Sequence, residues 1–214
     1  MADWVVISSM ATAAGTLVLA AATFASVRSA HRSAGVTERA LLAQIRPVLV
    51  NTRIADPTEK VGFADSHWMR VDGQRACIDV TDEAIYMAFT VRNVGAGVAV
   101  LDRWDICVVP EGDTRPDGHR DPSTFNRLTR DIYVPAGDQG FWQGVLRDPA
   151  APEFVELRKA VENGDLIMVD LLYEDHEGGQ RTVSRFGLMP TEHGGRITAT
   201  SRHWNLDRAD PRSE

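Results

Sequence analysis

The sequence is poor in the residues that build metal sites. Among its 214 residues are two cysteines, Cys77 and Cys107, and six histidines. Neither cysteine has another cysteine or a histidine at the spacing of a structural zinc site, and no His-Glu-x-x-His motif occurs. Asp65 with His67, and the carboxylates flanking His176, are typical of solvated loop edges. We therefore predict no bound metal.

Catalytic motifs are missing as well. The sequence has no Gly-x-Ser-x-Gly, no Gly-x-x-x-x-Gly-Lys and no Rossmann glycine fingerprint after a strand pattern. Ser184, between Val183 and Arg185 in a strand pattern, is expected to pack or to form a cross-strand hydrogen bond. We predict that the protein is not an enzyme and has no cofactor. A hydrolase with an active site assembled from distant loops is the remaining enzymatic hypothesis.

The two cysteines leave the compartment open. In a reducing cytoplasm they would remain thiols and fill space as small apolar side chains. Outside the cytoplasm, a bridge between Cys77 and Cys107 would be compatible with their positions in two separate strand patterns.

Charge is missing from one long stretch of the chain. The twenty-four residues between Asp3 and Arg28 carry no charged side chain. A helix of this length reaches about 36 Å, because each residue adds about 1.5 Å, whereas the hydrocarbon core of a bilayer measures about 30 Å. Residues 1–27 are therefore predicted to form a transmembrane anchor.

A cleaved signal peptide is the alternative interpretation of this stretch. Signal peptides begin with basic residues and have an apolar region of about 7 to 15 residues. Here the sequence starts Met1-Ala2-Asp3 without a basic side chain, and the apolar run is longer. A retained anchor is the better explanation.

The basic residues lie on one side of the apolar run only. None precedes it, and four follow it closely: Arg28, Arg32, Arg39 and Arg46. Because Lys and Arg near a span resist translocation, this asymmetry predicts a single-pass protein with its N-terminus outside and its C-terminal domain in the cytoplasm.

Residues 28–46 continue in a helical pattern as an amphipathic juxtamembrane neck. The pattern ends where Pro47 disfavours the helical conformation for Arg46. At about 100° per residue the arginines form one stripe, opposite a narrow apolar face. Arg28 and Arg32, nearest the membrane, are predicted to contact anionic lipid headgroups, at about 1 kcal/mol each. The alternative is that they only set the topology and solvate one face.

Two features of the anchor concern its surroundings in the membrane. Small residues four positions apart, Ala11 with Gly15 and Ala22 with Ser26, would let a second helix approach closely. A homo-oligomer is therefore compatible with the sequence. Trp4, at the start of the run, is typical of an interfacial anchor.

The remainder of the chain is acidic. Residues 47–206 are long enough for one domain with a sizeable core, and 207–214 form a polar tail. Residues 47–214 contain 19 basic and 28 acidic side chains, a net charge of −9. Phosphate binding needs a basic face, so nucleic acid is not expected as a partner.

Strand patterns dominate this domain. Residues 85–92 alternate between apolar and polar, as a strand with one buried face does. Residues 98–109 do the same, with Asp102 as an exception that suggests a bulge. The glycines in 93–97 predict a hairpin turn between the two, because glycine readily adopts positive φ. Further strand patterns occupy 47–54, 67–71, 75–80, 132–134, 140–146, 166–173, 182–188 and 197–204. Residues 166–172 are almost continuously apolar and predict the central strand.

One helix interrupts the strands. Residues 151–162 have apolar side chains at helical spacing, Pro152 near the first turn and Asn163-Gly164 at the end. Residues 111–131 are expected to form the longest loop. Many short strands with turn signals between them predict an antiparallel sandwich with one inserted helix.

The tryptophans of the domain lie in four different strand patterns and are expected to fill its core. They are Trp68, Trp104, Trp142 and Trp204. Adjacent Phe141 and Trp142 point to opposite faces of a regular strand. One of these two is therefore a candidate for an exposed contact patch.

A resemblance follows from two segments. Residues 92–99, Arg-Asn-Val-Gly-Ala-Gly-Val-Ala, with the later hairpin at 171–175, Leu-Leu-Tyr-Glu-Asp, resemble a pattern of small uncharacterised bacterial proteins. Those proteins have an N-terminal transmembrane helix, a helical neck and an immunoglobulin-like β domain. The resemblance implies an immunoglobulin-like β-sandwich in the bacterial inner membrane. It implies no activity and no site residues.

The sequence thus predicts a membrane-anchored protein-interaction module, for example an accessory subunit of a membrane complex. Its partners would be the membrane itself and a protein in the membrane or the cytoplasm. An extracytoplasmic immunoglobulin-like binding domain is the alternative, and it requires the opposite topology.

Overall fold

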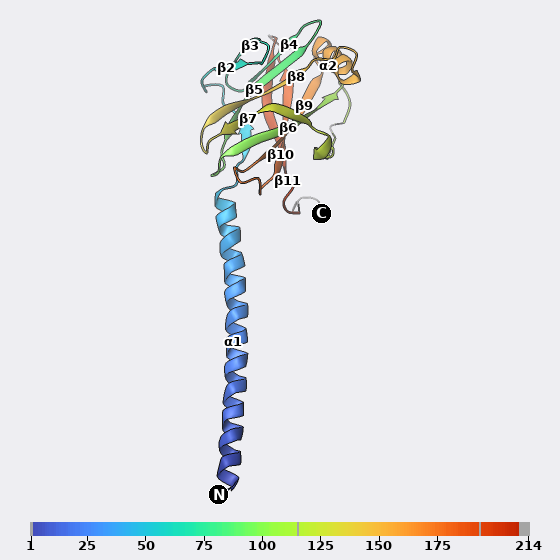
Figure 1. Cartoon of the computed structure of the whole chain (residues 1–214). Coiled ribbons are helices and arrows are strands. Elements are labelled where there is room, and N and C mark those ends of the chain that lie inside the picture. The colour runs from blue at the N-terminus through green and yellow to red at the C-terminus, as the bar shows by residue number, and fades with distance from the viewer. Residues whose placement is uncertain (1, 115, 193, 210–214) are drawn as a thin grey trace. The chain divides into compact units, whose positions relative to one another are not determined.

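The computed structural model describes residues 2–114, 116–192 and 194–209, and side chains within these ranges except those of 2–6, 11, 39 and 43. The chain divides into two compact units, and the division falls between Gln44 and Ile45. Figure 1 labels the elements of both units. Each unit is described by itself. The side chain of Trp4 and residues 210–214 of the expected polar tail lie outside the described residues.

The first unit is a single helix, α1, over Ala2–Gln44. It is continuous through the expected anchor and neck. Its apolar stretch has a mean hydropathy of 1.7, and by length and composition it is sufficient to cross a membrane. The hydroxyls of Thr12, Thr16 and Thr23 each donate to the carbonyl four residues earlier, at 2.8 to 2.9 Å. These three hydroxyls are thus satisfied within the helix.

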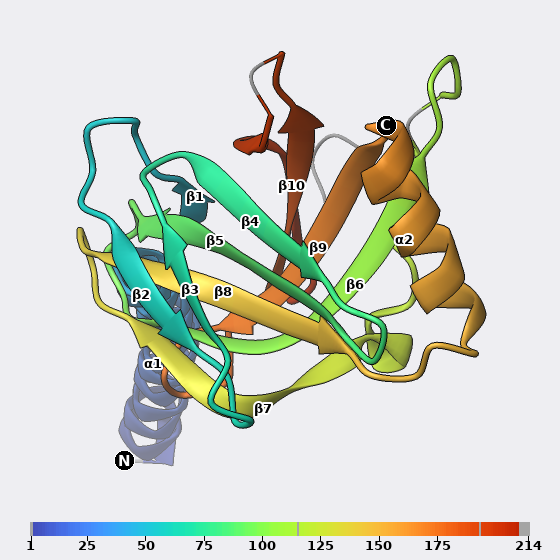
Figure 2. The same cartoon turned by 90° about the horizontal axis from the view of Figure 1, so that it is seen from above.

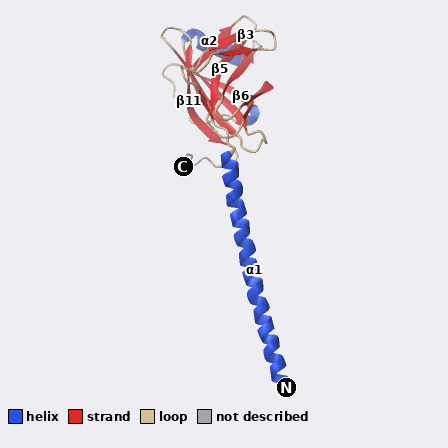
Figure 3. Ribbon diagram, turned by 90° about the vertical axis from the view of Figure 1, so that its left-hand side faces the viewer, coloured by secondary structure: helices blue, strands red, loops and turns tan. Residues whose placement is uncertain are grey.

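The second unit is mainly antiparallel β, as predicted, with strands joined into one nine-stranded sheet. Figure 3 shows strands throughout this unit and helix in short segments only. The strands are β1 (Leu49–Asn51), β4 (Arg75–Val80), β5 (Ile85–Asn93), β6 (Ala99–Val109), β7 (Asn126–Val134), β8 (Gln139–Leu146), β9 (Leu166–Glu174), β10 (Thr182–Pro190) and β11 (Arg196–Asn205).

The sheet curls around the core of the unit (Figure 2). β8 pairs with one edge of β5, and β4 and β1 pair with the other. The order then continues from β4 through β11, β10, β9 and β6 to β7. Only two residue pairs join β4 to β11, Ala76 with Arg196 and Arg75 with Ile197. The curl brings β7 and β8, the two end strands, next to each other.

Smaller elements complete the unit. β2 (Glu59–Gly62) and β3 (Trp68–Val71) form a separate two-stranded hairpin. β2 was not predicted, because Val61 is its only strongly apolar side chain and the segment therefore shows no alternating pattern. A 3₁₀ turn, η1, covers Pro122–Thr124 within the expected long loop, and β7 begins at Asn126, six residues earlier than expected.

The inserted helix α2 (Pro152–Asn163) confirms the prediction from its pattern. Pro152 occupies the first turn, where a missing N–H is tolerated, and Gly164 ends the helix in the left-handed conformation with a φ of 76°. Phe154, Leu157 and Ala160 form the buried face and join the main core.

Three of the four tryptophans expected in the core are buried, Trp104 and Trp142 in the main core and Trp204 in a smaller one. Trp142 is fully buried, and its ring lies 4.9 Å from that of Phe89 and 5.4 Å from that of Trp104, measured between centroids. Trp204 instead belongs to a small cluster with Phe125, Leu172 and Val183. The prediction for Trp68 was wrong, because 59% of its surface is exposed on the separate hairpin.

The predicted bulge at Asp102 is confirmed, since the register of β6 shifts between Leu101 and Arg103 in both of its ladders. The apolar stretch predicted as the central strand is β9, which is buried almost throughout between β6 and β10.

The predicted hairpin between residues 85–92 and 98–109 was wrong, because within the described residues β5 is laddered to β1, β4 and β8 and β6 is laddered to β7 and β9, so these two strands do not pair. The glycines of the connection between them also serve a different purpose than expected. Neither Gly95 nor Gly97 has a positive φ. A Cβ at Gly97 would lie 1.7 Å from the Ile45 carbonyl oxygen, and one at Gly95 would lie 2.4 Å from that of Arg46. Glycine is needed here because another backbone segment approaches closely.

The placement of Arg46 on the neck stripe was wrong. Helix α1 ends at Gln44, and Arg46 belongs to the β-rich unit. Its guanidinium group forms an ion pair with Asp207 and donates to the Asn205 side-chain carbonyl at 2.9 Å. The acidic partner beyond β11 fixes this arginine in the domain.

Candidate functional site

A groove lies between the β2–β3 hairpin and the strands β7 and β8. It consists of two hollows of about 530 and 60 Å³ that share Phe63, Ala64, Thr129 and Gln143. We call it the β7–β8 groove. Its other lining residues are Lys60, Gly62, Trp68, Trp104, Arg127, Leu128, Arg130, Phe141, Gly144, Val145 and Arg147.

The groove exists because β7 and β8 do not pair, although they are consecutive strands. In the part of the chain that the structure describes, β7 is laddered only to β6 and β8 only to β5. Asn93 forms hydrogen bonds with the backbone of the turn between β7 and β8. Its N–H donates to the Asp138 carbonyl at 3.0 Å, its carbonyl accepts from the Gly137 N–H at 2.9 Å, and its side chain donates to the Val134 carbonyl at 3.0 Å.

A bulge in β7 widens the opening. β7 pairs with β6 at Asn126 and Arg127 and again from Ile132 onward, so residues 128–131 have no partner in that ladder. Extra residues in one strand bend it away from its neighbours. Across the opening, the contact between the strands is made by side chains: Arg130 Nη2 donates to Gln143 Oε1 at 3.1 Å.

Aromatic rings form one end of the groove. Lys60 Nζ lies 4.6 Å from the centroid of the exposed Trp68 ring, a cation–π distance. A Cβ at Gly62 would lie 2.6 Å from Trp68, so glycine lets the ring lie across β2. Phe141 is half-buried, with the Arg130 guanidinium carbon 5.7 Å from its ring centroid.

The groove is electropositive within an acidic domain. Four of its lining residues are basic, namely Lys60, Arg127, Arg130 and Arg147, and none of the lining residues is acidic. Arg147 is paired with Asp65 at 2.7 Å, and Arg127 lies 3.9 Å from Asp102. Lys60 and Arg130 form no ion pair with any described carboxylate.

Asp65 organises the end of the groove opposite Trp68. Its carboxylate accepts from the Tyr86 hydroxyl at 2.5 Å and from Arg147 Nη1 at 2.7 Å. These two bonds hold the pKa of Asp65 well below its usual range, and the bond from Tyr86 raises the pKa of that phenol. The His67 ring stacks on Tyr86 at 4.0 Å between centroids. This end of the groove is therefore held in one geometry by a charged network.

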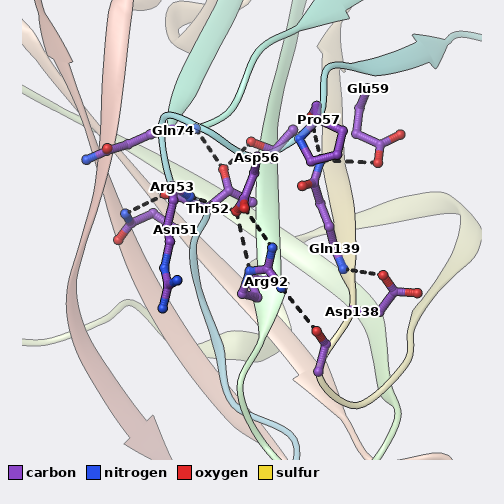
Figure 4. Close-up of polar contacts among 12 residues, drawn as sticks. Asn51, Thr52, Arg53, Asp56, Pro57, Glu59, Gln74, Arg92, Asp138 and Gln139 are labelled. Carbon is purple, nitrogen blue, oxygen red and sulfur yellow. Dashed lines mark hydrogen bonds and ion pairs between the residues drawn. The ribbon is translucent and has the colours of Figure 1, made fainter.

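A second polar network holds the β2–β3 hairpin against β8 (Figure 4). Gln139 Nε2 donates to the Pro57 carbonyl at 2.8 Å and to Glu59 Oε1 at 3.2 Å. Arg92 forms an ion pair with Asp56 at 2.8 Å, and this carboxylate also accepts from the Arg53 N–H at 2.8 Å. The N–H bond from Arg53 is the main reason that the pKa of Asp56 is lowered.

The same network reaches into the sheet. Thr52 Oγ1 lies 2.5 Å from Thr90 Oγ1 and accepts from the Gln74 N–H at 2.7 Å. Both threonine side chains are fully buried. The loop that carries the hairpin is thus fixed at its start to β5, and at its end to β8, by hydrogen bonds of normal length.

Ser184 has a structural role, as expected from its strand pattern. Its Oγ lies 2.9 Å from the Tyr173 hydroxyl and 2.6 Å from His203 Nδ1, and Ser184 and His203 are cross-strand partners. Ser184 is fully buried. A serine beside a histidine could suggest a nucleophile, but this hydroxyl is closed off from any substrate.

An ion pair on the outer side of the sheet was not foreseen. Arg185 binds Asp170 through two bonds of 2.7 Å and donates to the carbonyls of Pro116 and Gly118. Arg185 and Asp170 are each about 4% exposed. This pair attaches the loop between β6 and η1 to β9 and β10.

The residues predicted for sites lie apart from the groove. Arg28 and Arg32 are exposed on α1, in the other unit. Cys77 and Cys107 are free, half-buried thiols, and burial raises the pKa of both. Within the described residues, no three His, Cys, Asp or Glu side chains come together as a metal site.

Sequence reasoning found one part of the groove and missed the rest. Phe141 and Trp142 were expected to face opposite ways, and Phe141 does line the groove while Trp142 is buried. The exposure of Trp68 could have been recognised from the pattern of 68–71, since Met69 and Val71 form the buried face of this strand and Trp68 lies on the opposite face with Arg70. Lys60 and Arg130 carried no signal, because an isolated basic residue is typical of any surface.

No protein-family model, no curated protein and no solved structure matches this chain.

Proposed function

We propose that the protein is a single-pass, membrane-anchored protein-interaction module without enzymatic activity, such as an accessory subunit of a membrane complex. A partner polypeptide docks in the β7–β8 groove. The observation that carries this proposal is Trp68, which is 59% exposed beside the half-buried Phe141. Exposed aromatic residues in a preformed groove, with basic residues beside them, have the composition of interface hot spots.

The placement in the membrane is part of the proposal. Helix α1 spans the bacterial inner membrane with its apolar run, and Arg28 and Arg32 contact the headgroups on the cytoplasmic side. Residues 28–44 continue the same helix. At about 1.5 Å per residue they form a spacer of roughly 25 Å beyond the apolar run. The free thiols Cys77 and Cys107 agree with a reducing compartment.

The domain is proposed to be an immunoglobulin-like sandwich in a modified form. Supporting this, the two-pair junction of β4 with β11 is the weakest link of the sheet. It separates a half formed by β8, β5, β4 and β1 from a half formed by β11, β10, β9, β6 and β7. The core residues between the halves would then correspond to the interior of a sandwich.

A photo-crosslinking experiment in native membranes tests the interaction. A photoreactive phenylalanine analogue replaces Trp68 in the groove of the full-length protein. In the control it replaces Val155, an apolar residue of α2 that is 41% exposed. We expect a discrete adduct from position 68 and none from position 155. An adduct of twice the chain mass would identify a second copy of this protein as the partner.

The absence of an adduct from position 68 in native membranes would contradict the proposal, as would equal labelling from both positions. The first result means that no polypeptide occupies the groove. The second means that contact at the groove is no more specific than collision at any exposed surface.

A further inference from the structure

Resting on the proposed function, we infer that the partner enters the β7–β8 groove as an acidic, extended segment. Its carboxylates pair with Lys60 and Arg130, and an apolar side chain packs against Trp68 and Phe141.

The charge of the groove is the first argument for an acidic partner. Lys60 and Arg130 lie at the larger hollow without a carboxylate partner among the described residues, and each lies over an aromatic ring. Residues 47–214 carry a net charge of −9, so two cations without an acidic partner in one groove are unexpected from the charge of the domain. Complementary charges across an interface select the partner and speed its approach. The complement of this groove is an acidic partner.

The shape of the groove is the argument for an extended partner segment. The two hollows are joined through shared lining residues and run along β7 from Arg130 to Arg127. Within the described residues, β8 is laddered only to β5, and residues 128–131 of β7 have no partner in the ladder with β6. Free strand edges pair readily with an added extended segment, whose backbone completes their hydrogen bonds. An elongated groove beside such edges fits an extended polypeptide better than a compact ligand.

Nucleic acid would also meet cations and aromatic rings here, but the surroundings oppose it. A single strand carries a charge at every nucleotide, and its binding depends on neutralising many phosphates. Two of the four groove cations, Arg127 and Arg147, already face a carboxylate. Beyond the groove, the acidic domain repels a long polyanion. A short acidic segment avoids this repulsion.

The test uses the full-length protein in detergent and two labelled peptides of about nine residues, the length of a strand of roughly 30 Å. The first alternates glutamate with valine around a central tryptophan, and the second has glutamine in place of every glutamate. Fluorescence anisotropy measures both affinities, and a single-stranded oligothymidylate of equal charge serves as the competing class. We expect the glutamate peptide to bind at least about tenfold more tightly than the other two, with affinity falling as salt rises.

Variants locate the binding. Lys60→Glu with Arg130→Glu should weaken binding of the glutamate peptide by about tenfold or more, since each change replaces an attraction with a repulsion. The matched control is Lys159→Glu with Arg208→Glu, which makes the same charge change at exposed residues outside the groove. The control should bind as the wild type does, and circular dichroism should show both variants folded.

Equal binding of the glutamate and glutamine peptides, equal binding of the oligonucleotide, or no peptide binding at all would overturn the inference. Unchanged peptide binding by the variant Lys60→Glu with Arg130→Glu would also overturn it. These results are distinct from failure of the proposed function, because the crosslink from position 68 in native membranes does not depend on the charge of the partner. A persistent crosslink with charge-insensitive binding would retain the function and reject the acidic segment.

Discussion

Asn93 links the turns at one end of the domain through a single buried side chain. Its amide nitrogen donates to the carbonyls of Gly97 and Val134 at 2.6 and 3.0 Å, and its carbonyl oxygen accepts from the N–H groups of Val48 and Gly95 at 3.1 and 3.0 Å. The side chain therefore uses both donors and both acceptor positions. The same residue diverts the β7–β8 turn toward β5 and thereby keeps the groove open.

Replacement Asn93→Ala should destabilise the domain strongly. Four backbone groups, two in buried and two in partly buried bonds, would lose their partner, and each buried unsatisfied group costs about 1 to 3 kcal/mol, partly relieved by relaxation or entry of water. We expect a loss of about 3 to 5 kcal/mol in urea unfolding of the detergent-solubilised protein, followed by tryptophan fluorescence. Asn163→Ala, at the exposed end of α2, is the control and should cost less than about 1 kcal/mol. A small effect at Asn93 would show that the amide bonds are replaceable.

Gly97→Ala should be nearly as disruptive, although the change adds only a methyl group. Its Cβ would lie 1.7 Å from the Ile45 carbonyl oxygen, so one of the two backbones has to move. Gly118→Ala is the matched control, since nothing lies within 4 Å of the added Cβ and its φ is not positive. We expect the urea midpoint to fall for Gly97→Ala only. Equal midpoints for the two variants would contradict the close approach.

The depressed pKa of Asp65 predicts a dependence of stability on acid. A carboxylate whose pKa is lower in the folded state stabilises the fold above its unfolded pKa, which is about 4, and this contribution is lost as the pH falls further. Wild type should therefore be more stable than Asp65→Asn at pH 7, and the difference should shrink below about pH 4. Urea midpoints measured between pH 7 and 3 check this. Asp113→Asn, which removes a carboxylate on an exposed loop away from Tyr86 and Arg147, is the control for the loss of one negative charge.

At the scale of elements, local patterns predicted most of the strands and, by the clearest signals, α1, α2 and β9, whereas tertiary contacts decided β2 and the start of β7. Each of these three has a signal within its own residues, namely length without charge, helical spacing with a terminal glycine, or a continuous apolar run. β2 and the early start of β7 had no such signal. β2 is a strand because it pairs with β3, and the hairpin is placed by Gln139 and Arg92. Contacts this distant in sequence leave no periodic pattern.

The loop between β6 and η1 should depend on Arg185. Removing one partner of a buried ion pair costs about 3 to 5 kcal/mol, whereas replacing both by apolar residues is often neutral. We expect Arg185→Met to lower the unfolding free energy by about 3 kcal/mol and to expose the loop to trypsin at Arg120. Arg185→Met with Asp170→Leu should recover stability but not protection from trypsin, because the carbonyls of Pro116 and Gly118 still lack their donor. Protection in the double variant would argue that the loop is held by other contacts.

At the scale of the whole molecule, the chain combines a long apolar helix with an acidic β-rich unit. In the proposed function the helix lies in lipid, whereas the β unit, which has its own core, lies in water. The groove and the anchor would then act together, because anchoring restricts the partner search to the membrane surface and raises the effective concentration.

The orientation can be tested with a cysteine introduced at Ile54, which is 81% exposed on the β unit. In intact cells a membrane-impermeant maleimide should leave this cysteine unlabelled, and labelling should appear after permeabilisation. Arg28→Glu with Arg32→Glu should increase labelling of intact cells, because basic residues beside the span resist translocation. The same change at Lys159 and Arg208 should have no effect. Labelling of the parent protein from outside would establish the extracytoplasmic alternative.

The sequence by itself determined the features that depend on local composition: the apolar helix long enough for a membrane, the antiparallel β class of the remaining chain and the inserted helix. These follow from the solvent preference and spacing of neighbouring residues. The tertiary structure alone decided that β7 and β8 stay unpaired and that Lys60 and Arg130 meet in one groove. The physical reason is that these features arise from hydrogen bonds and charges between residues far apart in the chain, above all those of Asn93, which no local pattern encodes.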